Sequence, residues 1–257
     1  SCSEIPLTSL SETHLLHDSS GCRVERRQNG VVVKFGRRVT VAERDALEYA
    51  RTLQIPVPHL QDQQIQSAQH DQTESIWMDY IDGDNLEDVW PTMSPAQKKD
   101  IANQLGQILS SMRCRQSETG MIGSCNGGVV RDCRQLDVYT GGPFPDETSF
   151  NKFILDLFNA TPTDIRNALA HHLRSDHRIV FTHGDLTQHN IIVKDNQIRA
   201  LLDWEFAGWY PEYWEYVKFL DRHAKHRDWK DYAQYIFPEQ YHEELIVYQA
   251  LRRWQLQ

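Results

Sequence analysis

Two carboxylates and one amide in the C-terminal half have types and spacing that could bind a metal ion and accept a proton. Asp185 and Asn190 lie between two short apolar runs, and Asp203 directly follows the next apolar run. A loop with this spacing would present Asp185 to an acceptor hydroxyl and Asn190, one turn later, to a metal. Asp203 would supply the main carboxylate, and hard oxygen ligands of this kind are those that Mg²⁺ prefers. Such a set is suited to moving a phosphoryl group.

Each of these residues has an ordinary structural explanation when it is taken alone. An aspartate before a strand is commonly a cap or turn residue, and Asn190 followed by Ile-Ile-Val is a common start of a strand. Both motifs in the right order, each bounded by apolar strands, are much harder to explain by accident. We therefore interpret the set as catalytic.

The first eighty residues are predicted to be rich in strands. Residues 22–27 and 31–35 are two short runs on either side of Asn29-Gly30, which is a strong signal for a two-residue hairpin. A helix is predicted from Val41. The prolines in residues 55–58 require an extended chain, and residues 75–81 are apolar enough for a buried strand.

After residue 82 the sequence is predominantly helical in character. Asp84 and Glu87 have the spacing of a capping box, and Ser94-Pro95 marks the start of a long helix that ends near Arg115. Helices are also predicted at 147–159, at 163–173 and from about 212 onward, with a cluster of three strands at 179–182, 191–194 and 198–202. The sequence thus predicts an α+β, two-lobed protein kinase-like fold, with a small β-rich N-lobe (1–81) and a larger, mainly helical C-lobe (82–257).

The motifs themselves resemble a known family. His183-Gly184-Asp185-Leu with Asn190 has the spacing of a kinase catalytic loop, with glycine in place of arginine. Together with the segment Asp203-Trp-Glu-Phe-Ala-Gly-Trp, it resembles the aminoglycoside phosphotransferase and choline kinase-like superfamily, and the long aromatic tail is similar to the fungal members. The similarity extends from about residue 22 to the end. It implies a Mg²⁺-dependent enzyme that uses ATP or GTP to phosphorylate a hydroxyl of a small molecule.

The resemblance also implies roles for residues of the N-terminal half. Lys34 matches the strand lysine that holds the α- and β-phosphates of the nucleotide, although an exposed lysine on an alternating strand is the competing explanation. Glu43 or Glu48 could pair with it. Glu43 is preferred, because the family places this acid in the first turns of the helix.

The adenine or guanine base is expected to bind at residues 76–83, which resemble a kinase hinge. The backbone of Asp79 and Ile81 would hydrogen-bond the purine and Met78 would line the pocket, whereas a plain buried strand is the alternative. A G-x-G-x-x-G loop is absent. Ser19 and Ser20 are its nearest counterpart and could direct backbone amides towards phosphates, but a solvated turn explains them equally well.

Two residues near the proposed catalytic set are expected to support it. His183 is expected to brace the loop. Glu205 would act through a water molecule or take part in a structural salt bridge; the sequence does not decide between these roles. Protein kinase activity is a poor fit, since the chain passes from Asp203 into Gly208-Trp-Tyr-Pro with no room for an activation segment.

Composition excludes several other classes. A formal net charge of −9 disfavours a nucleic-acid partner, because binding phosphates requires clustered Lys and Arg. No apolar run approaches the length that crosses a bilayer, and the first residues lack the pattern of a secretory signal. Five cysteines without a C-x-x-C pair indicate reduced thiols. We therefore expect a cytoplasmic protein with no membrane partner.

The acceptor is the least defined part of this prediction. Acidic side chains between Trp77 and Trp90, and acidic and aromatic ones from 204 to 215, would suit a cationic or aromatic acceptor if both segments faced one cleft. Helix capping and packing explain the same residues. A nucleotide-binding scaffold that no longer transfers phosphate, or a repurposed enzyme, remains an alternative. The sequence leaves open the acceptor's identity, the choice between ATP and GTP, and the oligomeric state.

Overall fold

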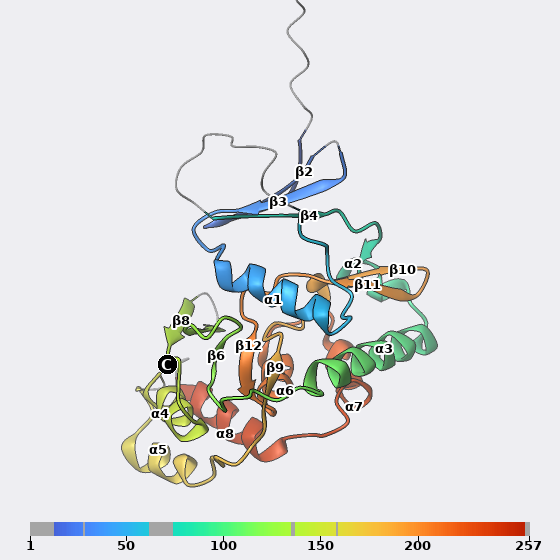
Figure 1. Ribbon diagram of the computed structural model, residues 1–257. Helices are drawn as coiled ribbons and strands as arrows, with labels where there is room; N and C mark the ends of the chain where they lie inside the picture. The colour runs from blue at the N-terminus through green and yellow to red at the C-terminus, as the bar shows by residue number, and fades with distance from the viewer. Residues whose placement is uncertain (1–12, 28, 62–73, 135–136, 158, 255–257) are drawn as a thin grey trace, which may run out of the picture. The chain divides into compact units, whose positions relative to one another are not determined.

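The computed structural model describes residues 13–27, 29–61, 74–134, 137–157 and 159–254 (Figure 1). The chain divides into two compact units. Unit 1 comprises residues 1–40 and 59–80, and unit 2 comprises residues 41–58 and 81–257. Residues 41–58 fall within the N-lobe of the sequence-based division, but they associate with unit 2. The division into lobes at residues 81 and 82 therefore stays a prediction.

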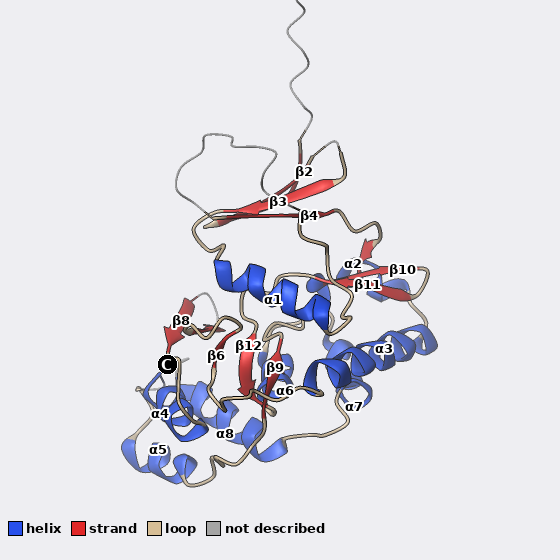
Figure 2. Ribbon diagram, in the orientation of Figure 1, coloured by secondary structure: helices blue, strands red, loops and turns tan. Residues whose placement is uncertain are grey.

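Unit 1 is built on a four-stranded antiparallel sheet in the order β1-β2-β3-β4 (Figure 2). The strands are β1 (His14–Ser19), β2 (Cys22–Arg26), β3 (Val31–Phe35) and β4 (Ser75–Asp79). The predicted hairpin joins β2 to β3, and Gly30 at its turn has a φ of 76°. This left-handed conformation is accessible to glycine without a steric cost, which explains why the Asn-Gly pair marks the turn.

Two small antiparallel sheets lie in unit 2. One has the order β11-β10-β5, with β11 (Gln197–Leu201), β10 (Ile191–Lys194) and β5 (Asp84–Asn85). The other has the order β6-β12-β9, with β6 (Gly123–Ser124), β12 (Gly208–Pro211) and β9 (Ile179–Thr182). The strands predicted at 179–182, 191–194 and 198–202 are all present. They lie in two sheets, because β9 pairs with β12, whose sequence carries no strong strand pattern.

The helices of unit 2 begin where local signals place them, with one exception. Helix α1 spans Val41–Thr52, and α3 (Pro95–Arg113) starts with a full capping box between Ser94 and Gln97. The short helix α2 (Leu86–Val89) is capped by Asn85, which accepts the Glu87 N–H at 3.0 Å. The predicted cap at Asp84 was therefore one residue off, since Asn85, the last residue of strand β5, is the one directly before the helix.

The remaining elements complete unit 2 (Figures 1 and 2). They are η2 (Trp90–Thr92), β7 (Val130–Arg134), β8 (Asp137–Gly141), α4 (Glu147–Leu157), α5 (Thr163–Ala170), η3 (Gln188–Asn190), α6 (Trp214–Asp221), η4 (Arg227–Tyr232), α7 (Ala233–Ile236) and α8 (His242–Arg253). The antiparallel β7–β8 hairpin and strand β12 were not expected from the sequence.

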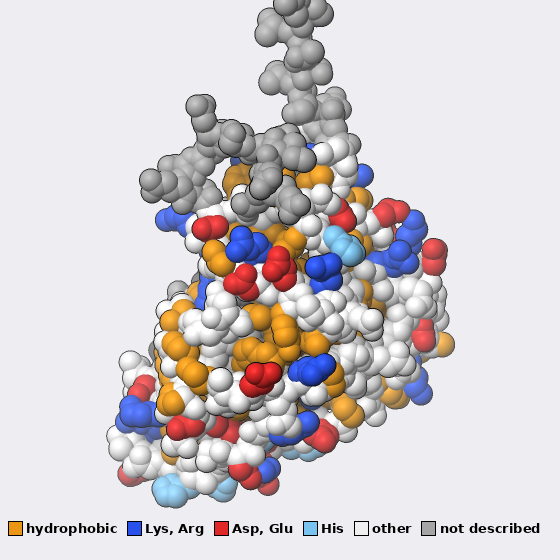
Figure 3. All heavy atoms as spheres, viewed as in Figure 1, with side chains coloured by type: hydrophobic (Ala, Val, Ile, Leu, Met, Phe, Trp, Pro, Cys, Tyr) orange, Lys and Arg blue, Asp and Glu red, His pale blue; other side chains and the backbone are white. Residues whose placement is uncertain are grey.

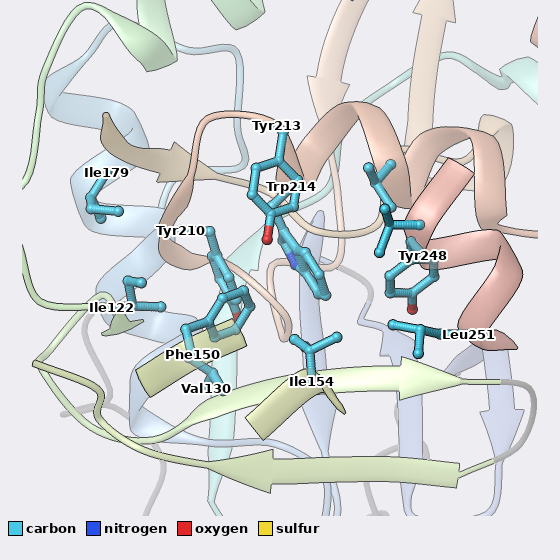
Figure 4. Close-up of a cluster of buried hydrophobic side chains, with 12 residues drawn as sticks. Ile122, Val130, Phe150, Ile154, Ile179, Tyr210, Tyr213, Trp214, Tyr248 and Leu251 are labelled. Carbon is cyan, nitrogen blue, oxygen red and sulfur yellow. The ribbon is translucent and has the colours of Figure 1, made fainter. Parts of the chain in front are cut away.

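The core of unit 2 is aromatic (Figure 4). Trp214 at the start of α6 stacks on Tyr210 of β12, with ring centroids 5.8 Å apart and planes within 4°, and meets Phe150 of α4 edge to face. Tyr248 of α8 also contacts Trp214, edge to face. These rings join β12, α4, α6 and α8 into one packed body, which also includes Ile179 at the start of β9.

Acidic and basic side chains are interspersed on the face shown in Figure 3. Within the described ranges, no helix is both long enough and apolar enough to span a membrane.

Candidate active site

The loop that follows β9 carries the predicted catalytic residues. Strand β9 is fully buried and ends at Thr182, and the chain then runs through His183, Gly184 and Asp185 to η3. Gly184 has a φ of 80°, and a Cβ atom there would lie 2.9 Å from the carbonyl oxygen of Phe206. Both constraints require glycine, which explains why no larger residue stands at this place in the loop.

The Asp185 carboxylate is held at both oxygens. Asn190 Nδ2 donates to Oδ2 at 3.1 Å and to the backbone oxygen of Asp185 at 2.9 Å. Arg222, the residue that caps the C-terminus of α6, places Nε 3.0 Å from Oδ1. A carboxylate oxygen accepts along more than one direction, so a hydroxyl could still bind. The orientation of the Asp185 carboxylate is thus set by the hydrogen bond from Asn190 and by the ion pair with Arg222.

The same contacts suit Asn190 and Asp203 to Mg²⁺. Because Asn190 donates to Asp185 through its amide nitrogen, its amide oxygen is the atom that a metal would bind. The backbone oxygen of Asn190 accepts the Leu202 N–H at 2.8 Å, which ties η3 to the residue before Asp203. Asp203 follows β11 with a φ of 61°, a left-handed turn that is uncommon for a non-glycine residue and is found at functional sites.

A magnesium ion commonly takes one or two protein carboxylate or amide ligands and completes its shell with water and phosphate oxygens. Asn190 and Asp203 are oxygen donors of that type. Among the described side chains, no group of three or more His, Cys, Asp or Glu residues is arranged to hold a metal. The donor set therefore fits a nucleotide-bound Mg²⁺ better than a transition metal.

His183 links the loop to β11. Its Nε2 lies 3.0 Å from the carbonyl oxygen of Leu202, and its Nδ1 accepts the Asp185 N–H at 3.2 Å. Burial lowers the pKa of this imidazole, and nearby Asp185 only partly opposes the effect. The neutral form with the proton on Nε2 satisfies both contacts. This arrangement supports the predicted bracing role rather than proton transfer.

Sequence reasoning missed the role of Glu215 on α6. Its carboxylate accepts the backbone N–H groups of His183 at 2.6 Å and of Gly184 at 3.0 Å. The side chain is fully buried, and burial raises its pKa to about 7, although the two N–H donors and Arg113 act against this rise. Glu215 therefore anchors the backbone of the catalytic loop to α6. An acidic residue within the aromatic run 213–216 was the only signal.

Two basic residues of unit 2 form ion pairs with acidic residues near the site. Arg131 of β7 lies 3.5 Å from Glu205, so Glu205 takes part in a salt bridge; its predicted role through a water molecule stays a prediction. Lys218 of α6 lies 2.6 Å from Asp132, with both side chains buried. Burial lowers the pKa of Lys218, but Asp132 and Tyr248 outweigh this and leave the pKa raised. These pairs attach strand β7 to α6 and to the segment that follows Asp203.

The two residues of the predicted phosphate-binding ion pair are both buried. Lys34 lies on β3, opposite Val24 of β2 and Ile76 of β4, and Glu43 lies in the first turn of α1. Burial disfavours the explanation of Lys34 as an ordinary exposed residue. Lys34 belongs to unit 1 and Glu43 to unit 2, so their pairing stays a prediction.

The other predicted nucleotide-binding residues lie in ordinary structural settings. Ser19 donates its hydroxyl to the Cys22 carbonyl at 3.3 Å, and Ser20 follows it in the turn between β1 and β2. Met78 of β4 is paired with Val32 of β3, and the Asp79 N–H donates to the His59 carbonyl at 2.9 Å. A purine bound at Asp79 would therefore hydrogen-bond to the backbone carbonyl of Asp79 and not to the Asp79 N–H, which is already donated. Ile81, just beyond β4, is half-buried.

Several of the acidic and aromatic residues that suggested a cationic acceptor have other partners. Glu212 accepts from Arg178 Nε at 2.8 Å, and Asp82 pairs with Lys194 at 2.6 Å. Trp204 is buried and contacts Phe181 and His183. The core in Figure 4 includes the buried rings of Tyr210, Tyr213 and Trp214. Pairing and packing thus account for the residues named here, and a cationic or aromatic acceptor stays a prediction.

Comparison with known proteins agrees with this geometry. The model of the phosphotransferase enzyme family (APH) matches residues 18–254. No protein with a curated description matches the chain. Among solved structures, a thermostable mutant of aminoglycoside phosphotransferase APH(4)-Ia has a TM-score of 0.68 at 12% identity, covering 96% of this chain and 86% of its own.

Two further structures show the same fold. The streptomycin–ATP–APH(2″)-IIa ternary complex has a TM-score of 0.59 at 15% identity, covering 95% of this chain and 81% of its own. The aminoglycoside 3′-phosphotransferase of type VIII has a TM-score of 0.60 at 14% identity. The match covers 95% of this chain and 93% of that protein. Identities this low show the fold alone. The α+β, kinase-like fold expected from the sequence is therefore confirmed. With the family model matching nearly the whole chain, this protein belongs to the APH phosphotransferase enzyme family, within the aminoglycoside phosphotransferase and choline kinase-like superfamily.

Proposed function

We propose that this protein transfers the γ-phosphoryl group of ATP or GTP to a hydroxyl of a small molecule. The observation that carries the proposal is the Asp185 carboxylate, which is oriented at both oxygens by Asn190 and Arg222 within a loop anchored by Glu215. This degree of preorganisation serves a reaction that depends on positioning more than on covalent chemistry.

Asp185 accepts the hydrogen bond of the acceptor hydroxyl and takes its proton late in the transfer, because the transition state is loose and requires little prior deprotonation. Asn190 and Asp203 would hold Mg²⁺. When it is bound, the ion offsets the charge that develops on the phosphate oxygens. His183 and Glu215 keep the loop in place during the transfer through their contacts with Leu202 and with the loop amides.

The nucleotide is proposed to be held by residues that the family resemblance selects. Lys34, supported by Glu43, would fix the α- and β-phosphates, and the turn at Ser19 and Ser20 would approach them with backbone amides. The purine base is proposed to contact Met78, the Asp79 carbonyl and the Ile81 backbone. A cytoplasmic location, where Mg²⁺ and nucleotide are abundant, completes the proposal.

Purified protein incubated with Mg-ATP or Mg-GTP and a metabolite extract tests the proposal. A species that gains the mass of a phosphate group in the presence of active enzyme is expected. Asp203→Ala should abolish this product and weaken Mg²⁺-dependent nucleotide binding, whereas Asp185→Asn should lower kcat by roughly 10²-fold or more while calorimetry still detects Mg-nucleotide. Nucleotide binding without product from any extract would instead favour the scaffold or repurposed-enzyme alternatives.

Normal turnover by either folded variant would contradict the proposed roles. Loss of nucleotide binding in Asp185→Asn as complete as the loss of turnover would show that Asp185 is structural. Glu239→Gln is a suitable control, because Glu239 is an exposed residue whose carboxylate accepts from the Tyr241 hydroxyl and not from the loop.

A further inference from the structure

Helix α6 contacts the catalytic loop near both of its ends. Glu215, its second residue, binds the loop amides, and Arg222, the residue that caps its C-terminus, lies beside Asp185. About two turns of helix, roughly 10 Å, separate the two contacts, and residues two turns apart lie on the same face of a helix. The orientation of Asp185 therefore depends on where the C-terminal end of α6 lies.

The peptide group that leads out of α6 is held at both of its polar atoms. Its carbonyl oxygen, which belongs to Asp221, accepts from Arg252 Nη1 of α8 at 3.0 Å. Its N–H, which belongs to Arg222, donates to the Lys218 carbonyl at 2.9 Å. The last carbonyl of a helix has no partner within that helix. Arg252 therefore supplies, from α8, the donor that fixes this peptide.

The same guanidinium also binds the Asp221 side chain. Arg252 Nη1 contacts Asp221 Oδ1, and the Asp221 side chain retains only 5% of its solvent exposure. Lys218 lies 4.0 Å from this carboxylate but 2.6 Å from Asp132, and the charge of Asp221 also acts on Lys230. Arg252 is closer to Asp221 than Lys218 is. The Arg252–Asp221 pair thus ties the last residue of α6 to α8, and the two helices pack against each other (Figure 1).

We propose that Arg252 is a positioning residue for Asp185 and that it acts through the Asp221–Arg222 peptide. This inference rests on the proposed phosphotransfer. Loss of Arg252 removes the donor to the Asp221 carbonyl and leaves the buried Asp221 carboxylate without the guanidinium that it contacts. The end of α6 then shifts, and Arg222 no longer holds the Asp185 carboxylate in one orientation. Because the reaction depends on positioning, such a shift lowers the rate of transfer and leaves nucleotide binding in place.

The test compares variants of the full-length protein. Arg252→Met removes the charge and every donor of the side chain, whereas Arg252→Lys keeps a cation that can reach one of the two acceptors. Arg253→Met is the matched control, because Arg253 is the next residue of α8 and is exposed. Calorimetry measures the affinity for Mg-nucleotide, and kcat is measured with an acceptor found in the extract screen.

Arg252→Met should lower kcat roughly tenfold or more, while the Kd for Mg-nucleotide stays near that of the wild type. Arg252→Lys should recover part of this loss, and Arg253→Met should leave kcat unchanged. Arg222→Met should lower kcat as well. In the Arg222→Met background, Arg252→Met should have no further effect on kcat, because its effect passes through Arg222.

An NMR signal tests the same coupling without any acceptor. The Arg222 Nε–H resonance is identified by its absence in Arg222→Met, and Asp185→Asn should shift it because Arg222 Nε lies beside the Asp185 carboxylate. Arg252→Met should shift this resonance too, and Arg253→Met should not. If Arg252→Met does not fold, Arg252→Lys decides the matter, and it should shift the resonance by a smaller amount than Asp185→Asn does.

An Arg222 resonance that stays in place in a folded Arg252 variant would overturn the inference. Losses of kcat of the same size in the wild-type and Arg222→Met backgrounds would overturn it as well, because the effect would then come from general packing. The inference and the proposed phosphotransfer can fail separately. Product formation with an unshifted resonance would leave phosphotransfer standing and remove the positioning role, whereas a shifted resonance without product from any acceptor would do the opposite.

Discussion

The buried carboxylate of Glu215 provides a sharp test of how the catalytic loop is anchored. Replacing Glu215 with Gln keeps the size of the side chain and one oxygen acceptor for the loop amides, but removes the titratable group. In the folded protein, burial raises the pKa of Glu215 from its usual 4.5 to about 7. The substitution should therefore change how stability depends on pH.

The sign of the effect follows from the higher pKa in the folded protein. A carboxyl group whose pKa is raised by folding contributes stability that is fully present below about pH 4.5 and is lost as the pH rises through 7. A tenfold difference in acid dissociation constant between the folded and unfolded protein corresponds to about 1.4 kcal/mol, so the loss for this group approaches roughly 3 kcal/mol by about pH 8. Glu215→Gln has no such loss. The free energy of unfolding of Glu215→Gln, relative to that of the wild type, should therefore rise by roughly this amount between about pH 5 and pH 8.

Urea unfolding at half-unit steps of pH, followed by tryptophan fluorescence, measures this difference. Trp204 and Trp214 are buried in unit 2 and report on its unfolding. Glu212→Gln controls for the loss of one negative charge, because Glu212 lies three residues earlier and pairs with Arg178 instead of the loop. Other groups that titrate in this range are common to both proteins and cancel in the difference.

Parallel stability curves for wild type and Glu215→Gln would refute the reasoning, because they would mean that the carboxylate is not held in the buried, loop-binding position. A difference of the same size in Glu212→Gln would refute it too, since the effect would then follow from net charge.

Three further predictions concern the packing around the site. His177 contacts Glu147 at 2.7 Å and Glu244 at 3.3 Å. Burial lowers the pKa of His177, but these two carboxylates outweigh burial and leave the pKa raised. The stability that His177 contributes should therefore be present below about pH 6.5 and be lost as the pH rises through the higher pKa of the folded state. His177→Gln should flatten that part of the curve, measured by thermal unfolding against pH. Lys218→Met should destabilise the protein by about 3–5 kcal/mol, because it leaves the buried charge of Asp132 uncompensated. Denaturant unfolding should show a smaller loss of stability when Lys218→Met is combined with Asp132→Leu. Equal losses in the single and the double variant would contradict the pairing. Trp214→Ala should cost about 3–5 kcal/mol from cavity formation in the aromatic core, and a loss near zero by the same measurement would show that the ring is not packed as described.

Much of the local structure could be predicted from sequence because its causes are local. The Ser94-Pro95 start of α3, the Asn29-Gly30 turn and the apolar runs of β9 and β10 each depend on residues within a few positions of one another. The loop motif at 183–190 and Asp203 belongs to the same class. Its spacing along the chain is what brings Asn190 to Asp185, so the proposed base and its amide neighbour could be identified from the order of residues alone.

The contacts that make this loop a defined site come from elsewhere in the chain. Glu215 reaches it from α6 and Arg222 from the end of that helix. No local pattern distinguishes these residues from ordinary surface charges, because their significance arises only when packing excludes water and brings them within a few ångströms of the loop. The sequence alone determined which residues could perform the chemistry. The tertiary structure decided what surrounds them, because electrostatic contacts depend on distance in space and not along the chain.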